Sequence, residues 1–125
     1  MIIISQPKLE VRENEVLVSS CIEDDKKHFR ETIFYKTSAT YRPYVVTEKA
    51  DLFVLSALMP ALFSQSDIRV EGTLSSDLKY ALENGLIYIL AKTYGVRPIK
   101  VHAERIETFE FGGKAVGAGC SMGVD

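Results

Sequence analysis

The sequence predicts an α+β fold, in which strands fill the first third of the chain and helices then alternate with strands. In the first third, apolar and polar residues alternate with a period of two, which is typical of half-buried strands. From residue 49 onward, longer apolar segments are separated by short strand-like runs. The length of 125 residues and the hydrophobic content of 46% are sufficient for one compact core.

The β-rich part is expected to begin with a strand and a hairpin. The segment Met1–Pro7 has a short apolar run, but neither the basic start nor the long apolar stretch of a signal peptide. A polar turn at residues 13–15 separates two alternating runs, which favours a hairpin pairing Leu9 and Val11 with Val16 and Val18.

A third strand is expected over Phe29–Tyr35, with Phe29, Ile33 and Tyr35 on one face. The residues that follow, Thr37–Pro43, are expected to form a connection. Pro43 lacks a backbone donor and restricts the residue before it, so regular structure is disfavoured there.

Two helices are predicted in the second half. Lys49–Phe63 is densely apolar and too long for one strand, so we expect a buried helix that Pro60 kinks or ends. The second helix has a serine cap at Ser75 or Ser76 and apolar residues at i, i+4 spacing. Gly95 stands where a left-handed residue ends such a helix.

Strands are expected on both sides of the second helix, over Asp67–Gly72 and Ile99–Ile106. A last strand of small residues is expected over Ala115–Cys120, beyond Gly112-Gly113. We therefore expect an N-terminal α+β domain over residues 1–111 and the start of an α/β domain over residues 112–125.

Charge and cysteine content exclude several classes of protein. Lys and Arg number 15 against 17 Asp and Glu, and the two signs are interspersed, so no clear nucleic-acid surface is expected. Cys21 and Cys120 lie far apart without a CxxC motif, which disfavours a zinc site or a disulfide framework. No stretch is long enough for a membrane span. We expect a cytoplasmic protein with reduced thiols.

Several polar clusters are weaker candidates for a site. His28 and His102 have no second ligand at metal spacing, and Asp24-Asp25 is interpreted as a solvated turn rather than a metal pair. The segment Tyr41–Tyr44 suits either stacking on a base or packing of a loop. The junction Glu71–Ser76 precedes a capped helix, whose N-terminus could bind an anion as any capped helix could.

The clearest chemical signal lies at the end of the chain. An apolar run passes into small residues, and Ser121, Gly123 and Asp125 follow at close spacing. Glycine lets successive backbone N–H groups approach a phosphate, and a helix after such a loop adds the positive end of its dipole. A serine hydroxyl is a further donor, whereas Asp125 is better suited to hold Mg²⁺ than to contact an anion.

These residues resemble the Ser-Gly-Gly-x-Asp-Ser signature of PP-loop ATP pyrophosphatases, which include asparagine-synthase-like and 7-cyano-7-deazaguanine-synthase-like enzymes. Ser121, Gly123 and Asp125 match the signature, Val124 takes its variable position, and Met122 replaces its first glycine. The final Ser of the signature would follow Asp125. We therefore expect the N-terminal part of such a protein, truncated within the phosphate loop.

The resemblance implies that ATP and Mg²⁺ are the cofactors. The phosphates would lie against Ser121, Met122, Gly123, Val124 and Asp125, with Asp125 as the metal ligand. The complete enzyme would adenylate a substrate carboxylate or carbonyl, release pyrophosphate and let a nucleophile displace AMP. The 125 residues alone would be inactive and supply no catalytic residue. Their N-terminal domain would serve substrate selection, partner docking or formation of a homodimer.

A reading from a different class remains open. The same residues are compatible with a stand-alone α+β binding or scaffold module that ends in a glycine-rich tail.

Overall fold

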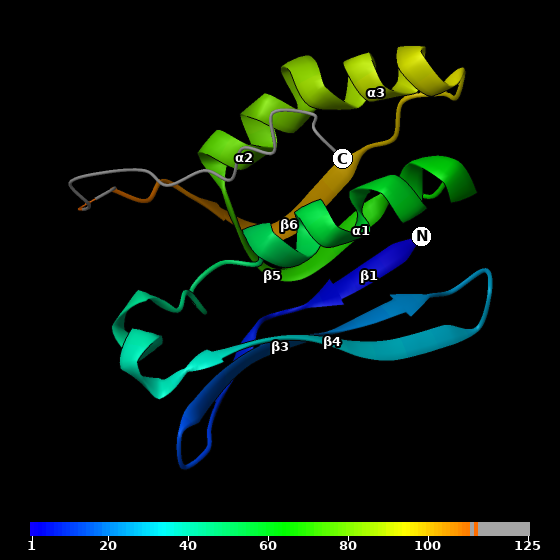
Figure 1. Cartoon of the computed structure of the whole chain (residues 1–125). Coiled ribbons are helices and arrows are strands. Elements are labelled where there is room, and N and C mark those ends of the chain that lie inside the picture. The colour runs from blue at the N-terminus through cyan, green and yellow to red at the C-terminus, as the bar shows by residue number, and fades with distance from the viewer. Residues whose placement is uncertain (111, 113–125) are drawn as a thin grey trace, which may run out of the picture.

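The computed structural model describes residues 1–110 and residue 112, and their fold is α+β as the sequence predicts. Six strands form one mixed sheet, and the helices cover one of its two faces (Figure 1). The predicted strand Ala115–Cys120 and the predicted start of a second domain lie outside the described residues.

The sheet is built around the N-terminal strand. β1 (Ile2–Ser5) is antiparallel to β3 (Glu15–Asp24) on one side and parallel to β5 (Ile68–Ser75) on the other. β2 (Lys8–Val11) continues the line of β1 along β3. β4 (Phe29–Ser38) pairs with β3 and forms one edge, and β6 (Val101–Glu107) is parallel to β5 and forms the other.

The predicted hairpin of β2 and β3 is confirmed. Leu9 lies opposite Val18 and Val11 opposite Val16, and backbone hydrogen bonds between Arg12 and Glu15 close the turn. The predicted strand Phe29–Tyr35 corresponds to β4. It is longer than predicted, because β4 stays paired with β3 until Ser38. The 3₁₀ helix η1 (Ala39–Tyr44) follows, so the break that Pro43 signals begins only after Ser38.

The two helices also differ in detail from the predictions. α1 (Asp51–Ser64) runs through Pro60 and is capped by Gln65, so of the two expected outcomes, a kink or an end at Pro60, the end does not occur. Proline removes a single donor, and buried residues on both sides of it, such as Leu58 and Leu62, hold the helix against the sheet.

The second helix consists of α2 (Ser76–Ala81), a π-helical turn η2 (Leu82–Leu86) and α3 (Ile87–Tyr94). Its predicted ends are confirmed. The Ser75 hydroxyl accepts the Leu78 N–H at 3.2 Å, and Gly95 adopts the left-handed conformation with φ 66°.

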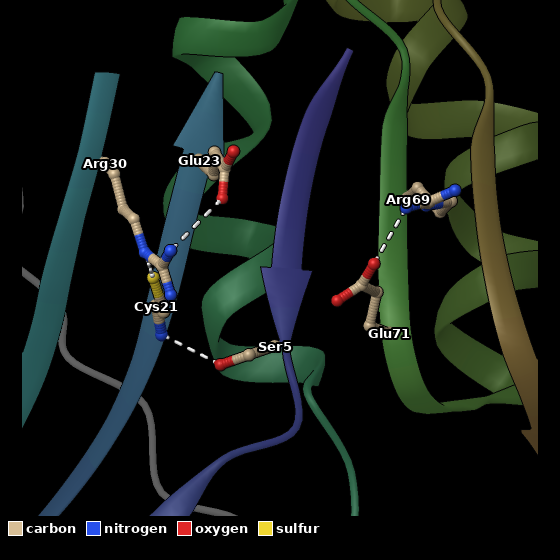
Figure 2. A network of polar contacts seen from close by, with 6 residues as sticks. All are labelled: Ser5, Cys21, Glu23, Arg30, Arg69 and Glu71. Atoms are coloured by element: carbon tan, nitrogen blue, oxygen red, sulfur yellow. Dashed lines mark hydrogen bonds and ion pairs between the residues drawn. The ribbon is translucent and has the colours of Figure 1, made fainter. Parts of the chain in front are cut away.

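The core lies between the helices and one face of the sheet. Alternate strand residues point into it, and these meet buried residues of α1 and α3; the core includes Ile4, Ile22, Ile68, Val70, Val101, Phe53, Val54, Leu62, Ile87 and Ala91. Between the core residues at the start of β5, Arg69 and Glu71 are exposed on the opposite face. That face is not covered by any described helix (Figure 2).

Candidate functional site

Two hollows lie between α1 and the hairpin of β3 and β4. The first, the Lys49 groove, has a volume of about 420 Å³ and lies between the start of α1 and the second half of β4; its lining includes Val18, Thr37, Tyr44, Lys49 and Leu52. The second, the Asp24 cleft, has a volume of about 460 Å³ and lies between the second half of α1 and the start of β4; its lining includes Asp24, Phe29, Ile33, Ala57 and Pro60. Both volumes are in the range of small-molecule sites.

Tyr35 of β4 reaches α1 alongside both hollows. Its hydroxyl lies 2.5 Å from the Ser56 hydroxyl, and its ring meets the Phe53 ring edge to face at a centroid distance of 5.8 Å. Ser56 also donates to the Leu52 carbonyl within α1. Tyr35 therefore connects β4, an edge strand of the sheet, to α1.

The free edge of β4 is the longest unprotected strand edge among the described residues. The Ala39 N–H donates to the Asn14 carbonyl at 3.0 Å. This bond identifies which residues of β4 are hydrogen-bonded to β3. Hydrogen-bonded pairs alternate along an antiparallel ladder. The backbone groups of alternate residues therefore point away from β3, and these are Arg30, Thr32, Phe34, Lys36 and Ser38.

The open face of the sheet carries a row of paired charges (Figure 2). The Arg30 Nε–H donates to the Cys21 sulfur at 3.3 Å, and the Glu23 carboxylate lies 4.0 Å from the same guanidinium. The hydrogen bond to Cys21, with a smaller contribution from Glu23, raises the pKa of Arg30 above its usual value. On β5, Arg69 pairs with Glu71 at 2.7 Å. Charges of both signs alternate across this face, so it presents no field of one sign.

The junction Glu71–Ser76 does not present a vacant anion site. The Asp51 carboxylate accepts the Ser75 N–H at 2.9 Å and the Ser75 hydroxyl at 2.6 Å. Lys49 balances that carboxylate at 3.3 Å. An internal carboxylate therefore already lies beside the start of α2, which is where an external anion would bind.

The candidate metal ligands of the sequence do not come together. His28 is exposed in the turn between β3 and β4, and His102 is exposed on β6. Asp25 pairs with the N-terminal ammonium group at 2.5 Å, whereas Asp24 is buried. The interpretation of Asp24-Asp25 as a solvated turn is therefore wrong for Asp24. Within residues 1–110 and 112, no three His, Cys, Asp or Glu side chains form a group that could hold a metal ion.

The predicted phosphate loop, Ser121 to Asp125, lies outside the described residues. Its five residues therefore remain a prediction, as do ATP and Mg²⁺ as cofactors and the domain boundary near Gly112. Of the residues that the structure does bring into hollows, Asp24 was interpreted from the sequence as part of a solvated turn, and Lys49 was not named as a candidate. The burial of Asp24 follows from its place at the end of β3, opposite Phe29, and the alternation of Val18, Ile22 and Asp24 on one face is the signal that indicates it.

Comparison with known proteins gives little similarity. No protein-family model matches the chain, and the search of curated proteins found no match. Among solved structures, the Fowlpox virus resolvase in complex with its Holliday junction DNA substrate matches with a TM-score of 0.25 and 16% sequence identity. The match covers 91% of this chain and 66% of the resolvase chain, so this chain spans less than two thirds of the length of that one. A similarity of this size carries no argument about fold or activity.

These comparisons contradict the expectation of a PP-loop ATP pyrophosphatase and of an ATP-dependent adenylating enzyme. No family model of that superfamily, or of any other, matches the chain. The physical reason for the error is that Ser121, Gly123 and Asp125 form a short pattern, and Met122 stands in place of the glycine on which close approach to a phosphate depends.

Helices that cross a bilayer need about 20 predominantly apolar residues. None of the helices formed by residues 1–110 is both long and apolar enough to cross a membrane.

Proposed function

We propose that this α+β unit is a binding module that joins two copies of the protein through the free edge of β4. The observation that carries the proposal is the unprotected length of this strand. Among the described residues, β4 pairs with β3 alone over all ten positions and contains neither proline nor a register shift. Edges of this kind accept a further strand, and natural proteins protect them with charged side chains, prolines, bulges or short length; of these, β4 has only the charges of Arg30, Glu31 and Lys36.

The side chains of β4 favour association over solvation. Phe29, Phe34 and Tyr35 are 47%, 56% and 42% exposed, respectively, which places aromatic surface along an unpaired edge. Only Arg30 and Lys36 add positive charge to the residues whose backbone groups point outward. Such a strand gains both main-chain hydrogen bonds and apolar contacts when a second strand pairs with it.

A second copy of β4 fits this edge in one register. With a two-fold axis through Phe34, Thr32 pairs with Lys36 of the other copy, and Arg30 pairs with Ser38. Every outward-pointing N–H and C=O then has a partner. On the α1 face, Ile33 of each copy lies opposite Tyr35 of the other. This pairing of a β-branched with an aromatic side chain is favourable and occurs in both halves of the interface.

The adjacent register is less favourable. A two-fold axis through Ile33 places Arg30 opposite Lys36 in both halves of the interface, and like charges directly opposite destabilise a sheet. It also leaves the outward groups of Ser38 without a partner. Charge and hydrogen bonding therefore both support the axis through Phe34.

The proposal is tested by Thr32→Pro. The Thr32 N–H points away from β3, so proline at this position keeps the ladder inside the protein but removes an interface donor in each half of the dimer. Each lost hydrogen bond contributes about 0.5–1.5 kcal/mol, so two weaken the dimer by roughly 5- to 150-fold. Sedimentation velocity over a concentration series measures the dissociation constant.

Thr32→Val is the matched control, because valine keeps the N–H and a β-branched side chain of similar size. We expect the wild type and Thr32→Val to dimerise equally, and Thr32→Pro to dissociate while its circular dichroism spectrum stays unchanged. A monomeric wild type at high micromolar concentration, or a Thr32→Pro dimer as stable as the wild type, would refute the proposal.

A further inference from the structure

The Asp24 cleft combines an apolar wall with a buried carboxylate. Ile22 and Ile33 contribute from the sheet, and Ala57 and Pro60 from α1. Asp24 lines the same cleft from the end of β3 and is only 6% exposed. A charged side chain so deeply buried is rare unless a partner offsets the loss of hydration.

The partners of Asp24 inside the protein are few. Its Oδ1 accepts the backbone N–H of Lys26 at 3.0 Å. No ion pair within 4.0 Å joins Asp24 to a basic side chain in the described part of the chain. The neighbouring N-terminal ammonium group pairs with Asp25 instead, and Lys27 lines the cleft without forming such a pair. The carboxylate therefore retains capacity to accept from a cation.

From this geometry we infer that the Asp24 cleft binds a small organic amine, with its ammonium group at the Asp24 carboxylate and its apolar body between α1 and β4. A charge-assisted hydrogen bond to a buried carboxylate is stronger than one between neutral groups. The volume of about 460 Å³ matches a ligand with one aromatic ring or a short aliphatic chain. Ser56 and Ser64 of α1 also line the cleft.

Other ligand classes fit less well. An anion would meet the Asp24 charge, and a purely apolar molecule would leave that carboxylate buried without a cation. A divalent metal ion needs several oxygen or nitrogen ligands, and no group of three suitable side chains exists in the described residues. All residues that line the cleft belong to one copy. Ile33 also lies opposite Tyr35 of the other copy in the proposed dimer, whereas Ala57 of α1 lies outside that interface and reports on the cleft alone.

The experiment is a titration of the full chain with phenethylamine, followed by methyl and backbone NMR. Signals of Ile33 and Ala57 are expected to shift, while those of Leu74, buried in the core away from the cleft, stay unchanged. The matched neutral probe is phenethyl alcohol, which has the same ring and chain but no charge. Loss of the charged hydrogen bond predicts that the alcohol binds roughly 10- to 150-fold more weakly.

The variant Asp24→Asn removes the charge and keeps an oxygen that can accept the Lys26 N–H. It is expected to weaken phenethylamine by the same factor and to leave phenethyl alcohol unaffected. Asp25→Asn, at the adjacent exposed carboxylate, is the control and is expected to change neither affinity. If Asp24→Asn does not fold, the comparison of amine and alcohol on the wild type decides. Equal affinity for the two probes, or no shifts at Ile33 and Ala57, would overturn the inference.

Discussion

Gly72→Ala is expected to destabilise the protein through the side chain of Gln6. Gln6 lies between β1 and β2 and connects two segments. Its Oε1 accepts the Thr73 N–H at 2.9 Å, and its Nε2 donates to the Thr47 carbonyl at 2.7 Å. A Cβ at residue 72 would lie 2.1 Å from that Oε1 and 3.1 Å from the Gln6 Cδ. The amide group must therefore move and lose both hydrogen bonds.

The size of the effect follows from what is left behind. Thr73 is 4% exposed, so its N–H would remain buried without a partner, which costs about 1–3 kcal/mol. The bond to Thr47 contributes about 0.5–1.5 kcal/mol more. We expect Gly72→Ala to lower the free energy of unfolding by about 2–4 kcal/mol, which is a large part of the ~5–15 kcal/mol typical of a domain.

Urea unfolding of a double-mutant cycle tests the cause. In a Gln6→Ala background the amide is absent, and only the Gln6 Cβ at 3.1 Å remains near the new methyl group. Gly72→Ala should therefore cost markedly less there than in the wild type. Gly85→Ala is the control, since nothing lies within 4 Å of its Cβ; it should stabilise the helix by about 0.5–1 kcal/mol. An equal cost of Gly72→Ala in both backgrounds would refute the reasoning.

Two further perturbations test the attachment of β4 and the chain terminus. Tyr35→Phe should lower the free energy of unfolding by only about 0.5–1.5 kcal/mol, because Ser56 keeps its bond to Leu52 and the ring stays against Phe53. Urea unfolding measures this, and a loss above about 3 kcal/mol would contradict it. The hydrogen bond from the N-terminal ammonium group lowers the pKa of Asp25 below its ordinary value of 3.8. The resulting stability is therefore present above pH 3.8 and lost as the pH falls through the lower pKa of the folded state. Asp25→Asn should flatten this part of the pH profile of unfolding, and an unchanged acid slope would contradict the assignment.

The α+β class and most elements were predictable from local pattern. Period-two alternation identified the hairpin of β2 and β3, and a serine cap and a glycine end identified the second helix. The parallel pairing of β1 with β5 was not predictable, because the run Ile2–Ile4 has no alternation and its partner lies more than sixty residues away. The pairing of strands so far apart in the sequence is set by tertiary contacts that the local pattern does not contain.

The errors have related causes. Pro43 suggested that β4 ends after Tyr35, but continuous pairing with β3 carries the strand to Ser38. Pro60 suggested a break in α1, but tertiary packing outweighs the loss of one donor. Asp24 was interpreted from its charged neighbours, whereas its strand position places it in the cleft. The contradicted enzyme assignment rested on a short motif without the structural context that such a motif needs.

The register of the proposed β4 dimer is tested most directly by cysteine cross-linking. In a background with Cys21 and Cys120 replaced by serine, Phe34→Cys would lie opposite itself across the two-fold axis, with Cα atoms about 5.5 Å apart, which suits a disulfide. Thr32→Cys would lie about 14 Å from its own copy, since four residues at about 3.4 Å separate the two, and would not cross-link. We predict rapid intermolecular disulfide formation for Phe34→Cys and none for Thr32→Cys under the same mild oxidation. Equal cross-linking of the two variants, or none for Phe34→Cys, would contradict the β4 dimer in this register.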